Sequence, residues 1–141
     1  MRILVADDER NIRDSIAAYV TGEGIEAVTA ADGTAARALI ESEAFDALVL
    51  DLRMPGIGGL DILRWLREGG PELPVIMISA YGDLKDAVQA MKLGARDYLV
   101  KPFDPEELLI RLKRILAERA QASREAAELQ SSEAKAPGFT R

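Results

Sequence analysis

The stretch Ala-Leu-Val-Leu-Asp-Leu-Arg-Met-Pro-Gly (residues 47–56) decides the fold class of this chain. Its first four residues are all apolar, as in a strand that is buried on both faces of a parallel sheet. The apolar run ends abruptly at Asp51, and Pro55-Gly56 then favours a turn. The pattern therefore predicts a buried parallel strand with a carboxylate at its carboxyl end.

This run and four further short apolar runs form a set of five predicted strands, at 2–6, 25–30, 46–51, 74–79 and 96–100. Longer segments of helical period alternate with them, at about 10–21, 34–43, 57–68 and 84–93, with a last one from about 105. Buried parallel strands need helices on both faces of their sheet. The alternation therefore predicts an α/β domain with three layers, helices on either side of a five-stranded parallel sheet.

Charged residues recur where these strands end. Asp7 and Asp8 follow the first strand, Asp51 ends the third and Lys101 follows the fifth. In the doubly wound strand order 2-1-3-4-5, the first and third strands are neighbours, so these charges would share one edge of the sheet. Three neighbouring acids repel one another unless cations lie among them. A lysine together with a hard cation such as Mg²⁺ (or Mn²⁺) would meet that need.

The composition limits the function classes. The chain has 141 residues, 48% of them hydrophobic, which suits one domain with one core. These residues include no cysteine and no histidine, which excludes disulfides, thiolate ligands, His-ligated zinc and Ser-His-Asp triads among them. A net charge of −6 argues against direct nucleic-acid contact, and no apolar run is long enough to span a membrane. We expect a cytoplasmic protein.

The motifs at the strand ends resemble those of the receiver domain of two-component response regulators. They are, in chain order, Asp7-Asp8, Asp51-Leu-Arg-Met-Pro-Gly56, Ser79-Ala80 and Lys101-Pro102-Phe103. The resemblance covers about residues 1–120 and implies the CheY-like (flavodoxin-like) fold with strand order 2-1-3-4-5. It leaves residues 121–141 as an extended last helix and a linker or tail.

The resemblance implies that Asp51 accepts a phosphoryl group from a sensor histidine kinase. Lys101 and Ser79 would then contact phosphoryl oxygens, because phosphoryl transfer needs positioning and charge neutralisation more than proton chemistry. Tyr98 would be the switch aromatic, which turns inward when the Ser79 hydroxyl moves toward the phosphoryl group. Such a protein is a signalling switch and not an enzyme, with its own phosphorylation and dephosphorylation as its only chemistry.

The resemblance also implies a metal site. Asp8, Asp51 and the backbone carbonyl of Arg53 would bind Mg²⁺, whereas Asp7 would act through a metal-bound water. The side chains of Arg53 and Tyr81 would lie near the path of the water that hydrolyses the acyl phosphate, which predicts slow self-dephosphorylation. The Lys101-Pro102 peptide bond would be cis.

Residues 80–83 (Ala-Tyr-Gly-Asp) and 87–95 are most similar to the NtrC-type branch. In that branch the receiver precedes an AAA+ ATPase and a helix-turn-helix DNA-binding domain. These 141 residues contain no phosphate loop and no basic recognition helix, so we expect the output domains to be absent from this chain. Phosphorylation would shift the face formed by residues 84–120, which would control an output domain or partner in transcription regulation. A homodimer through that face and the last helix is a further expectation.

Two other interpretations use the same residues. Aspartate-nucleophile, Mg-dependent phosphatases also place an aspartate on a parallel sheet, but their second acid follows two residues after the nucleophile, where this chain has Arg53. A nucleotide-binding fold would need a glycine-rich first turn, and residues 6–11 read Ala-Asp-Asp-Glu-Arg-Asn. Taken alone, Asp7-Asp8 could also cap a helix and Asp51 could start a turn. Their joint placement at strand ends favours the phosphoacceptor site.

Overall fold

The computed structural model describes residues 1–80 and 82–139, in which five strands alternate with five helices. The strands are β1 (Arg2–Ala6), β2 (Glu26–Ala30), β3 (Ala47–Asp51), β4 (Val75–Ala80) and β5 (Asp97–Lys101). The helices are α1 (Arg10–Gly22), α2 (Gly33–Ser42), α3 (Gly59–Arg67), α4 (Leu84–Lys92) and α5 (Pro105–Phe139). Every predicted element is present within about two residues of its predicted bounds, except for the end of α5.

The five strands form one parallel sheet in the order β2-β1-β3-β4-β5. This confirms the strand order that the family resemblance implies. In the register of the two central strands, Ala6 of β1 lies beside Leu50 of β3. The residues that follow them, Asp7 and Asp51, therefore leave neighbouring strands at the same edge of the sheet.

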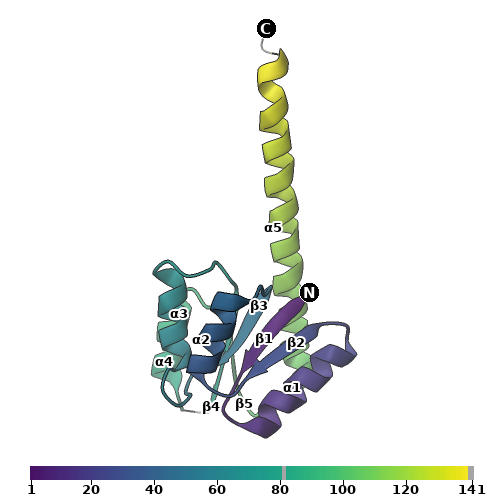
Figure 1. Cartoon of the computed structure of the whole chain (residues 1–141). Coiled ribbons are helices and arrows are strands. Elements are labelled where there is room, and N and C mark those ends of the chain that lie inside the picture. The colour runs from purple at the N-terminus through teal and green to yellow at the C-terminus, as the bar shows by residue number, and fades with distance from the viewer. Residues whose placement is uncertain (81, 140–141) are drawn as a thin grey trace.

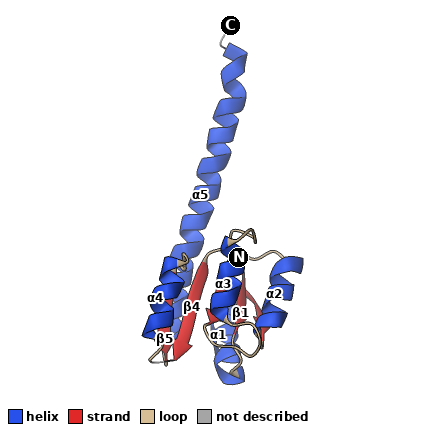
Figure 2. Cartoon of the chain, turned by 90° about the vertical axis from the view of Figure 1, so that its left-hand side faces the viewer, coloured by secondary structure: helices blue, strands red, loops and turns tan. Residues whose placement is uncertain are grey.

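The helices cover both faces of the sheet (Figures 1 and 2). Leu4 and Ala6 of β1 pack in a core with residues of α2, α3 and α4, whereas Ile3 and Val5 pack on the opposite face with residues of α1 and α5. All four side chains are fully buried. The uninterrupted apolar runs in the sequence follow from this arrangement, because each strand presents alternate side chains to two apolar layers.

Two glycines bring helices close to the loop after β3. A Cβ atom at Gly59, the first residue of α3, would overlap the backbone oxygen of Asp51. A Cβ atom at Gly33, the first residue of α2, would overlap the backbone of Ile57. Both positions therefore need glycine for close approach. Gly56 has a φ of 76°, and the turn that it allows delays the start of α3 to residue 59.

Helix α5 is longer than the domain needs. Its first turns are buried against the sheet and α1 through Leu108, Leu109, Leu112, Ile115 and Leu116. The Arg119 guanidinium then donates to the backbone oxygens of Asp46 and Glu72 at 3.3 Å, which ties α5 to the domain.

Beyond Arg119 the helix projects from the domain (Figure 1). It continues as one helix through Phe139, past Ser131, where the sequence suggests a linker or tail. Leu129, an apolar residue on the projecting part of this helix, is 63% exposed. Among the described residues, no helix is both long and apolar enough to cross a membrane.

Candidate functional site

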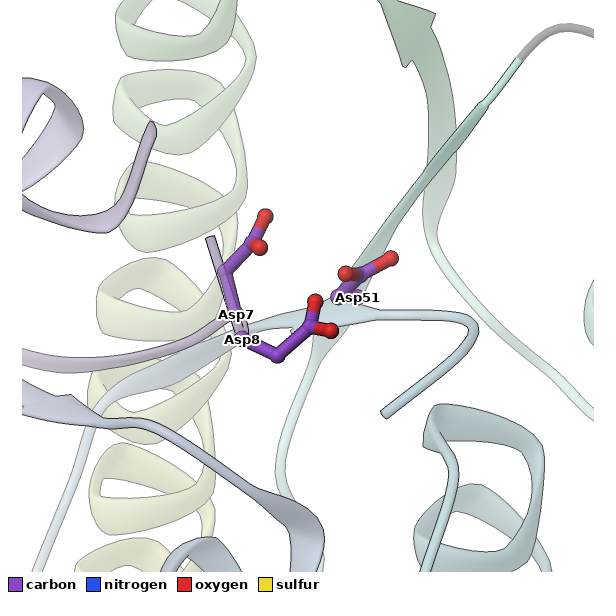
Figure 3. Close-up of side chains that lie close together, drawn as sticks. All are labelled: Asp7, Asp8 and Asp51. Atoms are coloured by element: carbon purple, nitrogen blue, oxygen red, sulfur yellow. The ribbon is translucent and has the colours of Figure 1, made fainter. Parts of the chain in front are cut away.

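Three carboxylates converge at the carboxyl edge of the sheet (Figure 3). Asp7 and Asp8 follow β1, and Asp51 is the last residue of β3; one oxygen from each lies within 4.8 Å of the others. Asp7 is fully buried and Asp51 is 5% exposed, whereas Asp8 is open to solvent. The structure therefore brings together the three acids that the sequence predicts to be neighbours, in a cluster that is accessible from one side.

Lys101 supplies a positive charge to this cluster from β5. Its Nζ atom lies 3.0 Å from Asp7 Oδ2, 3.2 Å from Asp51 Oδ2 and 3.2 Å from Glu9 Oε1. Burial alone would lower the pKa of Lys101, but the contact with Asp7 and the charge of Asp51 outweigh it and raise the pKa. Lys101 is therefore a permanent ammonium group at this site.

The environment of Asp51 disfavours its charged form. Burial is the largest cause and the neighbouring charge of Asp7 the next; together they raise the pKa of Asp51 to about 7, against the opposing effect of Lys101. The charge of Lys101 thus offsets only part of the rise in the pKa of Asp51. A further cation at the cluster would stabilise the Asp51 carboxylate.

The acids fit a hard divalent cation. Asp7 Oδ1 accepts a hydrogen bond of 2.8 Å from the backbone N–H of Glu9. Asp7 Oδ2 is fully buried and has no aligned hydrogen-bond donor, although Lys101 lies within ion-pair distance of it. A buried carboxylate oxygen without a donor can accept a metal-bound water or a metal. Three carboxylates of this kind form an acidic pocket that could bind Mg²⁺.

The backbone of Arg53 also reaches the Asp51 carboxylate. Its N–H lies 3.4 Å from Asp51 Oδ1. Ligation of a metal by the Arg53 carbonyl stays a prediction. The guanidinium of Arg53 lies with Asp83 and Asp86 at the start of α4. The predicted effect of Arg53 and Tyr81 on self-dephosphorylation also stays a prediction, because Tyr81 lies outside the described residues.

Ser79 lies beside this cluster and contacts Tyr98. Ser79, in β4, is 1% exposed; the strand register pairs its neighbour Ile78 with Asp51. The hydroxyls of Ser79 and Tyr98 share a hydrogen bond, and Tyr98, in β5, is partly buried. The two residues of the predicted switch are therefore in direct contact through their hydroxyl groups. The Lys101-Pro102 bond at the end of β5 is cis, as predicted.

Comparison with known proteins agrees with this arrangement. The family model of the response regulator receiver domain matches residues 3–113. The chain belongs to this family. The acids of the cluster, Ser79 and Lys101 all lie inside the matched range.

Relatives of this receiver domain include response regulator MprA of Mycobacterium avium (strain 104), which is 42% identical over 116 residues. That match covers 82% of this chain and 51% of the relative; MprA of Mycobacterium ulcerans (strain Agy99) is 40% identical, with 91% and 55% covered. The chain thus spans about half the length of the curated relatives that it matches.

Solved structures with this fold include NtrX from Brucella abortus in complex with ATP, at a TM-score of 0.81 and 38% identity. The match covers 91% of this chain and 29% of that one. A CheY-like receiver domain protein from Methanospirillum hungatei JF-1 has a TM-score of 0.80 and 32% identity, with 86% and 97% covered. The receiver domain therefore has the CheY-like fold, with both MprA regulators and NtrX among its relatives.

The sequence pattern did not single out several residues that shape the site of this receiver domain. Glu9 is a third partner of Lys101, besides Asp7 and Asp51, and Arg13 donates to the backbone oxygen of Asp7 at 2.8 Å. Gly59 sets the distance between α3 and Asp51. Glu9 directly follows the acidic pair, so the sequence could have indicated that it lies near Lys101. The contact of Arg13, six residues after Asp7, depends on how the short turn after β1 places the start of α1.

Proposed function

We propose that Asp51 accepts a phosphoryl group from the phosphohistidine of a sensor histidine kinase, in a reaction that depends on Mg²⁺. The observation that carries the proposal is the buried Asp51 carboxylate, which faces Asp7 and Asp8 and lies 3.2 Å from Lys101. In the transfer, an Asp51 oxygen forms a bond to phosphorus as the phosphorus–nitrogen bond breaks. The histidine nitrogen keeps the electron pair of that bond.

The residues around Asp51 would have two electrostatic roles, metal binding and pairing with the phosphoryl oxygens. Asp7, Asp8 and the Arg53 carbonyl, with Asp51 itself, would hold the Mg²⁺, with Asp7 acting through a bound water. The bound ion would neutralise phosphoryl oxygens and favour the charged form of Asp51. Lys101 is already charged and positioned, and after transfer it would pair with one phosphoryl oxygen in place of the Asp51 oxygen.

Ser79 and Tyr98 form the proposed switch. Ser79 would donate to a second phosphoryl oxygen, and to do so it must exchange its hydrogen bond with the Tyr98 hydroxyl for one to the phosphoryl group. Tyr98 would then lose a partner and repack against α4. A packed aromatic with two arrangements is a bistable element of the kind that transmits such changes.

The output surface is proposed to be the face formed by residues 84–120. Apolar side chains are unusually exposed there: Leu84 (75%), Val88 (48%) and Met91 (47%) on α4, Val100 (40%) on β5 and Ile110 (61%) on α5. Such a face suits an output domain, a partner or a second copy of the chain, and the projecting α5 would extend the contact of a homodimer. Control of transcription, as in the NtrC-type branch, is the proposed outcome.

A phosphatase acting on external substrates is the alternative function. In that class the position two residues after the nucleophile holds an acid; here Arg53 occupies it, and its guanidinium pairs with acids of α4. The described residues thus offer no general acid at that position. We therefore propose that the chain acts only on its own phosphoryl group and does not turn over external substrates.

Incubation with acetyl phosphate, with and without Mg²⁺, tests the proposal. We expect the intact mass to increase by one phosphoryl group only with Mg²⁺, and hydroxylamine to remove that group, as it does for acyl phosphates. Asp51→Asn should abolish the adduct, whereas Asp14→Asn, an exposed acid on α1, should leave it unchanged. An adduct of undiminished yield in Asp51→Asn would contradict the assignment. Sustained hydrolysis of p-nitrophenyl phosphate would favour the phosphatase.

A further inference from the structure

Helix α4 is held to the domain with little apolar burial. Its buried residues are Ala87 and Ala90, whereas the similar-sized α3 buries Ile62, Leu63 and Leu66. At about 0.8 kcal/mol per buried methylene-sized group, two alanine side chains stabilise the packing of a helix only weakly. Polar contacts at the two ends of α4 therefore have a large share in fixing its position.

One arginine holds each end of α4. At the carboxyl end, Arg67 of α3 donates to the backbone oxygens of Leu93 and Gly94, both at 2.8 Å. At the amino end, the Arg53 guanidinium lies 3.2 Å from Asp83 and 2.6 Å from Asp86. Figure 1 shows α3 and α4 beside each other at one side of the sheet. The Arg67 contact is remote from the acid cluster, whereas Arg53 follows Asp51 by two residues.

Arg53 is paired with the two acids that could otherwise accept hydrogen bonds from the first turn of α4. Asp83 is at the N-cap position, and Asp86 is the third residue of the helix. Acids at these two positions can bond to the free backbone N–H groups of the first turn, and such a cap stabilises a helix by about 1 kcal/mol. Asp83 makes no side-chain cap hydrogen bond, and its carboxylate pairs with Arg53.

In two other helices of the same chain, an N-cap aspartate that is not paired with an arginine does bond to the first turn. The Asp32 carboxylate accepts a hydrogen bond of 2.7 Å from the N–H of Ala35 at the start of α2. The Asp104 carboxylate accepts one of 2.9 Å from the N–H of Glu106 at the start of α5. The missing cap at Asp83 thus coincides with the presence of Arg53, which is bonded to its carboxylate.

A phosphoryl group on Asp51 would compete for Arg53. It adds a charge of about −1.5 to −2 and three strong acceptor oxygens. The Arg53 backbone N–H already lies 3.4 Å from Asp51 Oδ1, and its guanidinium is on a long, flexible side chain that is 68% exposed. Arginine pairs with phosphoryl oxygens as it does with carboxylates, and these two carboxylates have the cap of α4 as an alternative partner.

We propose that Arg53 links the acceptor site to α4: it holds Asp83 and Asp86 away from the helix cap, and a phosphoryl group on Asp51 draws it off so that they cap the helix. The link rests on the proposed function of Asp51, but the ion pairs that it uses exist without phosphorylation. It differs from the Ser79–Tyr98 pair, because it acts on the amino end of α4 by charge and not by packing. In the released state, α4 would keep the Arg67 contact and its buried alanines but lose the contact with Arg53.

The experiment is amide hydrogen exchange of α4, followed by NMR, in the untreated chain and in the chain treated with beryllofluoride and Mg²⁺. The variants are Arg53→Gln and a matched control, Arg64→Gln, because Arg64 pairs with Asp61 on the surface of α3. In untreated Arg53→Gln we expect the amide of Lys85 or Asp86 to exchange about fivefold more slowly than in the unchanged chain, the equivalent of a regained cap. Arg64→Gln should exchange like the unchanged chain.

In the treated samples, the unchanged chain should show the same protection of the first turn, and Arg53→Gln should show little further change there. Unaltered or faster exchange at those amides in untreated Arg53→Gln would overturn the link. So would a treated Arg53→Gln variant whose first turn responds as strongly as that of the unchanged chain. Bound beryllofluoride is followed separately by fluorine NMR: its absence in the unchanged chain would overturn the proposed function of Asp51, while the untreated comparison would still decide whether Arg53 withholds the cap.

Discussion

The Nζ atom of Lys101 lies 3.2 Å from Oδ2 of Asp51, although β4 separates the strands that carry the two residues. The lysine side chain therefore extends across the end of β4, past Ser79, to reach the acid. This contact gives the Asp51 carboxylate a counter-charge from within the domain itself. We therefore expect Lys101 to stabilise the domain in addition to its proposed contact with a phosphoryl oxygen.

Replacement of Lys101 by methionine should destabilise the metal-free domain. The variant leaves buried Asp7 and Asp51 without a cation, and the loss of one partner from a buried ion pair costs about 3 kcal/mol or more. The free energy of unfolding in urea with EDTA measures this cost. Lys113→Met is the control, because Lys113 is 59% exposed and only loosely paired with Glu23. Equal stability of the two variants would contradict a structural role for Lys101.

Stability without divalent ions should depend on pH through Asp51. Its pKa rises from 3.8 to about 7 on folding, so the folded state binds more protons than the unfolded state between these values. The contribution of Asp51 to stability is therefore greatest below about pH 4 and is lost as the pH rises to about 7, at up to about 1.4 kcal/mol per pH unit.

Asp51→Asn removes this titration and measures it. The difference in unfolding free energy between the variant and the unchanged chain should grow in favour of the variant from about pH 4 to pH 7. Asp14→Asn on α1 should show no such trend. A constant difference across this range would mean that Asp51 ionises normally in the folded domain.

Mg²⁺ should stabilise the domain through the acid cluster. An ion at 100 times its dissociation constant raises the free energy of unfolding by about 2.7 kcal/mol if only the folded state binds it. Asp8→Asn should weaken Mg²⁺ binding by about tenfold or more, measured by calorimetry or thermal unfolding. Asp14→Asn should bind Mg²⁺ normally. Equal binding by the two variants would place the ion outside the cluster.

Gly59→Ala should perturb the acceptor. The added Cβ would overlap the Asp51 backbone oxygen, so either α3 or the end of β3 must move. We expect a loss of about 3 kcal/mol in stability and a slower reaction of Asp51 with acetyl phosphate. Gly22→Ala is the matched control, because nothing lies within 4 Å of a Cβ at that position. If both variants react at the same rate, the close approach of α3 is not needed for the geometry of the acceptor.

Arg53→Asn should shorten the lifetime of the phosphorylated state. An arginine beside the phosphoryl group hinders the approach of water, and the shorter amide would not. Loss of the acyl phosphate from purified, phosphorylated protein gives the rate, with Arg64→Asn as the surface control. A rate that stays the same or falls in Arg53→Asn would remove Arg53 from the control of dephosphorylation.

The strand ends made most of the fold and site predictable. Continuous apolar runs identify strands buried on both faces, and once β1 and β3 are neighbours, Asp7 and Asp51 must meet at one edge. The partners of Arg53 were not predictable in the same way. Its contact with Asp83 and Asp86 depends on how the β3–α3 loop and α4 lie in space, and neither segment has a local pattern that specifies the other.

The acids at the start of α4 show where a local signal misleads. Asp83 and Asp86 have the spacing of a helix cap, and the helix does begin there, yet Asp83 makes no cap bond and both acids pair with Arg53. Gly59 is the opposite case, a required residue that the sequence does not mark. A glycine that is required for close approach has no mark in the sequence that distinguishes it from one in an open turn, such as Gly24.

The length of α5 means that a small tilt at its base causes a large displacement at its far end. About 20 residues of this helix extend beyond Arg119, or about 30 Å at 1.5 Å per residue. A tilt of about 10° at the base would move the far end of such a helix by about 5 Å, enough to separate or join side chains in van der Waals contact. A small rearrangement beside Asp51 could thus become a displacement of nearly one helical turn at the far end of α5.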